Sequence, residues 1–327
     1  MPSLHSKMVK QDKLRTQSIL TQIEETEKSF CISYINGQKN PPELFGTQIA
    51  LDVIPIFYNI LNNVGKQRKI SLIIRSHGGD IDAPLPIVSL LREYCDKLEI
   101  IVPENAHSAA TLIALGCDRI IMTPVSSLSP IDPQININTN NKDTNTLIRF
   151  SVEDVAGYYQ LLEKLKITDK SKIKALEYIT QTINPTILGQ IERVRKLINI
   201  YADKLLSYTT IDTNAKNNII RTLSESIPSH QYRISRKEVS ELGLPVQKAN
   251  EALHKLLKSL MDEYKSILKE VDQELLINIP EEKANIEQEY IRSIIETQGI
   301  SYVFISKFVF HKNGKVDKVY NQWRAMK

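Results

Sequence analysis

Short apolar segments alternate with helical ones between residues 70 and 123. Strand-like runs occur at Ile70–Arg75, Leu98–Pro103 and Ile120–Thr123, and helical patterns occur at Pro84–Tyr94 and Ser108–Cys117. Each apolar run has the length and the β-branched character of a buried strand. Because parallel neighbours need crossover connections, this alternation predicts a mainly parallel sheet with helices packed on it.

The chain before this region predicts three further elements. They are a polar helix over Lys7–Lys28, a strand over Phe30–Ile35 and, after a loop with Pro41-Pro42, a helix over Gln48–Asn63. The first helix carries few apolar residues, whereas the strand is apolar and suits burial.

The pattern changes after Pro133. Residues 136–145 are rich in Asn and Thr and almost free of apolar side chains, which predicts a mobile loop. Ser151 to Asp154 fits a capping box and predicts a helix that reaches about Leu165. Helical spacing after Pro185 and over 253–271 predicts two long amphipathic helices, and a second capping box, Ser235 to Glu238, predicts a short helix between them.

The C-terminal segment has strand character. Tyr302–His311 is rich in Val, Ile and Phe, Asn313-Gly314 is a strong turn signal, and Val316–Trp323 follows. This pattern predicts a β-hairpin that covers a sheet edge or docks on a partner.

Composition narrows the class of protein. The 327 residues are 42% hydrophobic and 24% charged, with a net charge of +4, which is typical of a globular protein and gives no basic patch for nucleic acid. The first 13 residues lack the apolar core of a secretory signal, and Ile49–Leu61 is shorter than the roughly 20 residues that span a membrane. We expect a cytoplasmic protein without a membrane span. Cys31, Cys95 and Cys117 have no metal-ligand spacing, and nothing indicates a metal or an organic cofactor.

Two bends carry the candidate chemistry. Ser76-His77-Gly78-Gly79-Asp80 follows one predicted strand, and Asn105 to Thr111 follows the next. Glycines at a strand end leave backbone N–H groups accessible, and a serine at a strand-to-helix bend holds its hydroxyl clear of the sheet. We therefore expect Ser108 to be a nucleophile, with Gly79, Ala109 and the neighbouring Gly78 forming an oxyanion hole. Taken singly, a glycine pair is a common turn and a serine at a helix start is usually a cap.

The order of these residues resembles the signal peptide peptidase family. The strand, Gly-Gly, helix, strand and Ala-x-Ser-Ala order is followed by Thr111–Leu115, Asp118 and Pro130–Gln134, and the likeness resumes at Ser229–Ile234 and Glu238–Leu244. It is strongest for the branch called serine dehydrogenase proteinases, within the Clp protease and crotonase fold. His77 stands where many relatives have proline, and Ala109 and Ala110 stand where they have glycine.

This resemblance implies an α/β fold, a repeated ββα spiral with helices packed on the sheet, and a peptidase domain in 48–246. Outside it, the residue pattern predicts an N-terminal helix and strand in 1–47 and a C-terminal helix and β-hairpin appendage in 247–327. The implied activity is hydrolysis of peptide bonds in protein or peptide substrates by a serine peptidase that forms homo-oligomers.

The general base is not fixed by the pattern. Related families use a lysine, or a histidine with a carboxylate, to take the serine proton. His230, in the closing segment that resembles the family, is the best single candidate. Lys142, His77 and Asp132 are further candidates for a base or an orienting group. His107 is a poor partner, because adjacent side chains on an extended segment point to opposite faces.

Two other functions remain open. Crotonase-type enzymes use the same pair of backbone N–H groups to hold an acyl-CoA thioester, although they usually place carboxylates over the substrate. This chain has only Glu104 within four residues of Ser108. A catalytically inactive relative that serves as a scaffold or binds a partner is the other alternative.

Overall fold

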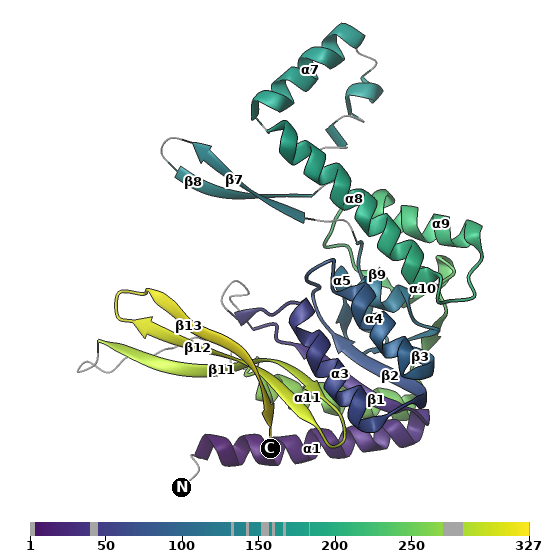
Figure 1. Ribbon diagram of the computed structural model, residues 1–327, viewed down its shortest axis with the longest axis vertical. Coiled ribbons are helices and arrows are strands. Elements are labelled where there is room, and N and C mark those ends of the chain that lie inside the picture. The colour runs from purple at the N-terminus through teal and green to yellow at the C-terminus, as the bar shows by residue number, and fades with distance from the viewer. Residues whose placement is uncertain are drawn as a thin grey trace.

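An eight-stranded sheet forms the centre of the computed structural model (Figure 1). The structure describes residues 4–39, 45–131, 134–141, 144–151, 157–158, 161–165, 168–182, 184–270 and 284–326. The strand order is β10-β5-β3-β2-β1-β11-β12-β13. The first five of these are parallel: β10 (Val246–Lys248), β5 (Arg119–Met122), β3 (Cys95–Val102), β2 (Gln67–Arg75) and β1 (Phe30–Asn36). The parallel sheet predicted from the alternation of strand and helix patterns is therefore confirmed.

Side chains of this sheet alternate between two apolar layers. Ile70, Leu72 and Ile74 of β2 belong to one buried cluster, whereas Ile73 belongs to another on the opposite face. The first face packs against α3 (Ile54–Val64), α4 (Pro84–Glu93), α5 (Ala109–Leu115) and α8 (Pro185–Leu206). The second face packs against α1 (Leu4–Glu27) and α11 (Glu251–Ile267). The sheet is therefore covered by helices on both faces, as parallel sheets require.

The C-terminal strands extend the sheet from the edge of β1. β11 (Asn285–Glu296) pairs antiparallel with β1, and β12 (Ser301–His311) and β13 (Val316–Met326) continue outward. The predicted hairpin is present, with Gly314 at φ 80° in its turn. The pattern did not predict β11, because charged residues interrupt its apolar alternation. The Tyr264 hydroxyl of α11 reinforces the junction by donating to Glu296 Oε2 at 2.9 Å.

The division of the chain into the parts 1–47, 48–246 and 247–327 stays a prediction.

One expectation for the middle of the chain is wrong. Within the segment predicted to be a loop, residues 136–141 and 144–145 are strand, because β7 (Gln134–Asn141) and β8 (Thr144–Ser151) pair as an antiparallel hairpin. The pairing sets Ile135 opposite Phe150 and Ile137 opposite Ile148. Apolar residues two positions apart are typical of a strand, although the average composition of this segment is that of a loop. Ser151 ends β8. The rest of the predicted capping box lies outside the described residues, and residues 157–158 and 161–164 are helical within the range predicted for that helix. This hairpin and α7 (Asp169–Thr182) project from the body at the end far from α1 (Figure 1).

The remaining short elements lie between β5 and β10 in the sequence, or close to the bends at Ser76–Asp80 and Asn105–Thr111. They are the 3-10 helix Leu51–Val53, α9 (Thr213–Arg221), the π-helix Thr222–Ser226, α10 (Arg236–Glu241), β4 (Asn105–Ala106), β6 (Ser127–Leu128) and β9 (Ile234–Ser235). The capping box at Ser235 and Glu238 is present and opens α10.

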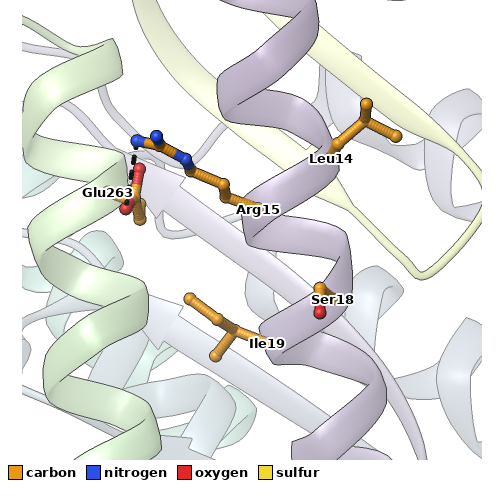
Figure 2. A pocket seen from close by; sticks show the side chains of 5 residues that line it. All are labelled: Leu14, Arg15, Ser18, Ile19 and Glu263. Carbon is orange, nitrogen blue, oxygen red and sulfur yellow. Dashed lines mark ion pairs between the residues drawn. The ribbon is translucent and has the colours of Figure 1, made fainter.

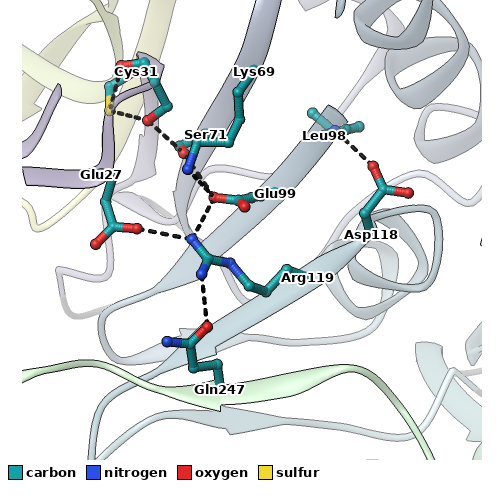
Figure 3. Close-up of polar contacts among 10 residues, drawn as sticks. Glu27, Cys31, Lys69, Ser71, Leu98, Glu99, Asp118, Arg119 and Gln247 are labelled. Atoms are coloured by element: carbon teal, nitrogen blue, oxygen red, sulfur yellow. Dashed lines mark hydrogen bonds and ion pairs between the residues drawn. The ribbon is translucent and has the colours of Figure 1, made fainter. Parts of the chain in front are cut away.

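A charged network lies at the amino ends of the parallel strands (Figure 3). Glu99 of β3 is 6% exposed and pairs with Lys69 at 3.2 Å and Arg119 at 2.8 Å. Arg119 also pairs with Glu27 of α1 at 2.9 Å. Buried charge is tolerated here because each member has an opposite partner. This network fastens α1 to the sheet at the end opposite the two bends.

A shallow pocket lies between α1 and α11 (Figure 2). Leu14, Arg15, Ser18 and Ile19 line it from α1, and Glu263 lines it from α11. It belongs to the layer on the far face of the sheet from α5. Across the ranges that the structure describes, every helix is too short or too polar to cross a membrane.

Candidate active site

Two backbone hydrogen bonds hold the two bends side by side. β2 continues into Ser76, which forms a parallel bridge with Ala106 of β4. The Ser76 N–H donates to the Asn105 carbonyl at 3.0 Å, and the Ser76 carbonyl accepts from the His107 N–H at 3.0 Å. Gly78 and Ser108 each lie two residues beyond this bridge. The register therefore places the glycine pair beside the serine bend, at the carboxyl edge of the sheet.

Ser108 has a backbone conformation that is rare for a residue with a side chain. Its φ is 51° and its ψ is −113°, which costs about 1–3 kcal/mol of strain. The Ser108 N–H donates to Ser129 Oγ at 2.8 Å, and its side chain makes no capping hydrogen bond to α5. The residue is thus a strained strand-to-helix bend of the kind that exposes a nucleophile, and the simple cap is not what the structure shows.

Gly78 lies directly against the Ser108 side chain. A methyl group placed on Gly78 would lie 2.7 Å from Ser108 Cβ and 3.2 Å from its Oγ, and the φ of Gly78 is 110°. Both the space and the conformation therefore require glycine. The first glycine of the pair lets the backbone approach the serine closely.

Ile49 holds Gly79 from the other side. The Ile49 N–H donates to the Gly78 carbonyl at 2.9 Å, and the Ile49 carbonyl accepts from the Asp80 N–H at 2.8 Å. Because both flanking peptide groups point toward Ile49, the N–H of Gly79 itself points away from it. A Cβ on Gly79 would lie 2.1 Å from the Ile49 carbonyl oxygen, so this contact also requires glycine.

The backbone N–H groups of the bends differ in their availability. The Gly78 N–H donates to Ser76 Oγ at 3.0 Å and is therefore already engaged, and a role of Gly78 in the oxyanion hole stays a prediction. Within the described ranges, the N–H groups of Gly79 and Ala109 have no hydrogen-bond acceptor. Ala109 is fully buried, and a buried donor left unpaired is costly unless a ligand completes it.

A second, small sheet brings the loop of His230 to the serine bend. β6 pairs with β4 on one side and with β9 on the other, so Leu128 faces both Ala106 and Ile234. His230 lies four residues before Ile234 and is half-buried. Its charge is one of the causes that lower the pKa of His107. His230 thus lies close enough to His107, the residue before Ser108, for its charge to affect the pKa of His107.

His77 and His107 lie side by side at the site, with ring centroids 5.7 Å apart. His107 Nε2 is 2.9 Å from Ser127 Oγ. Burial, and then the nearby positive charges of His77, Arg233 and His230, lower the pKa of His107 to about 4. Burial and Arg75 also lower the pKa of His77, which remains an exposed residue. A neutral His107 serves as a hydrogen-bonding support at neutral pH.

The general base is not identified by contact. In the part of the chain that the structure describes, no side chain hydrogen-bonds to the Ser108 hydroxyl. The candidates Lys142 and Asp132 lie outside the described residues. Glu104 is occupied elsewhere, because its carboxylate lies 2.9 Å from Arg75 Nε and also binds Lys265. This engagement leaves Glu104 poorly suited to the acid or base role of a crotonase-type carboxylate.

Several supporting residues were not predicted from the sequence. Ser76 Oγ accepts from Asn36 Nδ2 at 3.0 Å as well as from Gly78, and Asn105 Nδ2 donates to the Ser76 carbonyl at 2.8 Å. Ser129 fixes the Ser108 N–H and is itself held by Thr111 Oγ1 at 3.1 Å. The serine-rich run 126–129 was the one available signal, since short polar side chains often satisfy backbone groups at bends. Among the described residues, no three His, Cys, Asp or Glu side chains could share a metal ion.

A strained serine at a strand-to-helix bend is a feature of one class of serine hydrolases. Comparison with known proteins shows the family of this chain. Residues 2–290 match the family of ClpP-like SDH-type serine proteinases, and the chain belongs to that family. The resemblance and the fold class expected from the two bends are thereby confirmed.

Curated relatives come from Methanocaldococcus jannaschii. Uncharacterized protein MJ0137 is 26% identical over 242 residues, which cover 72% of this chain and 75% of that protein. Uncharacterized protein MJ1495 is 28% identical over 178 residues, which cover 54% of this chain and 51% of that protein.

Solved structures that are similar in fold include two proteases. A variant of the 1510-N membrane-bound stomatin-specific protease is 16% identical, with a TM-score of 0.39, and the likeness covers 66% of this chain and 79% of that chain. ClpP1 from Listeria monocytogenes is 14% identical, with a TM-score of 0.37, and the likeness covers 72% of this chain and 99% of that chain.

The backbone strain at Ser108 predicts an unusual order of stabilities. Ser108→Gly should have a free energy of unfolding about 1 kcal/mol higher than that of Ser108→Ala, because glycine adopts a positive φ without strain. Urea denaturation of the two variants measures the difference. At Ser207, whose φ is −67°, the same pair of substitutions should show the reverse order. Equal stabilities at Ser108 would mean that its conformation stores no strain.

The lowered pKa of His107 predicts a loss of stability in acid. Between its pKa of about 4 in the folded chain and the ordinary value of 6.5, the unfolded chain binds a proton that the folded chain does not, so stability falls as the pH falls. In His107→Gln, the fall in unfolding free energy from pH 7 to pH 5 should be smaller by about 2 kcal/mol. Denaturant titrations at the two pH values measure it. An unchanged difference would contradict this account.

Proposed function

We propose that this chain is a serine peptidase in which Ser108 attacks the carbonyl carbon of a peptide bond. The observation that carries the proposal is the pair of unoccupied N–H groups, Gly79 and Ala109, that flank a strained serine. Membership of a serine proteinase family supports the same reaction. The substrate class is therefore a peptide or an unfolded protein segment.

The first step forms a bond between Ser108 Oγ and the carbonyl carbon, while a base takes the hydroxyl proton. Negative charge develops on the former carbonyl oxygen, and the N–H groups of Gly79 and Ala109 stabilise it by about 3 kcal/mol each. The proton then passes to the leaving amine as the C–N bond breaks. Water hydrolyses the acyl-enzyme in a second round with the same base.

The position of the supporting groups favours this reaction. Ser129 holds the Ser108 N–H, and Ser76 binds the Gly78 N–H, so neither competes for the oxyanion. Both supports are buried serines. A preorganised donor pair requires no reorganisation when charge develops, which is what makes such a site effective.

Among the described residues, we assign the role of base to His230. The antiparallel pairing of β9 with β6 delivers its loop to the serine bend. His107 is less suited, because its pKa of about 4 makes it a weak base and its ring binds Ser127. Lys142 is the alternative base and Asp132 the alternative orienting group. For any lysine, a dry site would have to lower the pKa toward the working range.

The nucleophile is tested with a fluorophosphonate probe and a casein substrate. We expect the parent chain to be labelled at one serine and to hydrolyse casein, and we expect Ser108→Ala to lose both properties by at least a hundredfold. Ser207→Ala, which changes an exposed serine at the end of α8, is the matched control and should behave as the parent. Labelling that persists in Ser108→Ala would refute the nucleophile, and a parent chain that never reacts would favour an inactive scaffold or an acyl-CoA enzyme.

The base is tested by comparing His230→Ala with Lys142→Ala. If His230 takes the proton, its removal should lower kcat about 100-fold to 10,000-fold while the thermal midpoint stays close to that of the parent. Lys142→Ala should then retain most activity. The opposite pattern of losses would transfer the role of base from His230 to Lys142.

A further inference from the structure

Arg233 occupies a fixed place beside the candidate site. It immediately precedes β9, in which Ile234 pairs with Leu128. Because the strands are antiparallel, the same end of this ladder leads into Arg233 on one strand and into Ser129 on the other, and the Ser129 hydroxyl accepts from the Ser108 N–H at 2.8 Å. The paired strands therefore hold the Arg233 backbone close to the serine bend, although its side chain is exposed.

The guanidinium charge of Arg233 reaches the histidines of the site. It is among the causes that lower the pKa of both His77 and His107. The charge of Arg233 thus acts on both imidazole groups of the site.

No acidic partner within the described ranges neutralises Arg233, which makes no ion pair and no side-chain hydrogen bond there. The carboxylates of the surrounding elements have other partners. Arg75 binds Glu270 through two hydrogen bonds and also pairs with Glu104, and Ser235 and Tyr232 bind Glu238. Arg233 therefore presents five N–H donors to solvent from a backbone position next to the serine bend.

We propose that Arg233 binds a carboxylate of the substrate and so makes this site prefer peptides with a negative charge near the scissile bond. This inference rests on the proposed peptidase function. A guanidinium binds a carboxylate through two parallel hydrogen bonds, and the bound peptide shields the pair from water. The carboxylate comes from an Asp or Glu side chain or from the free C-terminus of a short peptide.

The test uses the full chain and internally quenched peptides of one sequence. Each position near the scissile bond is Glu, Gln or Lys in turn, and each peptide is made with a free or an amidated C-terminus. For the parent we expect kcat/KM to be about tenfold higher for Glu than for Gln at one position, and this ratio to fall toward one as salt is raised. In Arg233→Gln the ratio should be close to one at every salt concentration.

Two controls separate charge recognition from a structural role. Lys237→Gln removes an equal charge from an exposed residue on α10 and should keep the parent ratio. Fluorophosphonate labelling of Ser108 should be equal in the parent and in Arg233→Gln, because the probe carries no carboxylate. Arg233→Glu should reverse the preference so that the Lys peptide is cleaved faster than the Glu peptide.

The outcomes are distinguishable. A preference abolished by amidation identifies the peptide terminus, and one that follows the Glu position identifies a side chain; both support the proposal. A parent without a charge preference, an Arg233→Gln variant that keeps it, or loss of labelling in Arg233→Gln would overturn the role of Arg233 and leave the peptidase function standing. A parent that neither labels nor cleaves would overturn the peptidase function and this inference with it.

Discussion

The site depends on one short stretch of backbone pairing, the parallel bridge between Ser76 and Ala106. It sets the register of two strand ends, and both bends begin two residues beyond it. A slip of one residue would move Gly78 away from Ser108 and bring a side chain into a space that admits none. The closeness of the serine to the glycine pair is thus a property of sheet register, which the buried β2 and β3 strands fix over their whole length.

Near the bridge between Ser76 and Ala106, hydrogen bonds made by several residues offset the backbone strain of Ser108. The positive φ of Ser108 is held by Ser129, and Ile49 clamps the two peptide groups that flank Gly79. An unfavourable backbone conformation persists in a folded chain when several surrounding contacts fix the same segment. This also explains why the site is built largely from backbone groups and small residues, with the larger polar side chains of Asn36 and Asn105 placed behind it.

The parts of the site that sequence could predict are those encoded locally. A strand followed by Gly-Gly, and a strand followed by a serine and a small-residue helix, are each short local patterns, and parallel neighbours bring such bends to one edge. The use of the Gly78 N–H by Ser76, and the arrival of residues 229–235 beside the serine, could not be predicted in this way. The first depends on the orientation of a single serine side chain. The second depends on β4, β6 and β9, which are only two residues long and leave no periodic signal. The hairpin of β7 and β8 was missed for a similar reason, since its composition is that of a loop and its pairing alone defines it.

The pairing of β1 with β11 bears on how the chain folds. The Ser33 hydroxyl binds the Glu296 carbonyl at 3.3 Å across 263 residues of sequence. During synthesis, β1 therefore emerges long before its antiparallel neighbour, and its open edge stays available to other chains until nearly the whole protein has been made. Contacts of such wide separation form slowly because a long loop must close first. The last strands thus cover the edge of β1. A ribosome that stalls before residue 285 would leave β1 as an exposed edge strand of the nascent sheet.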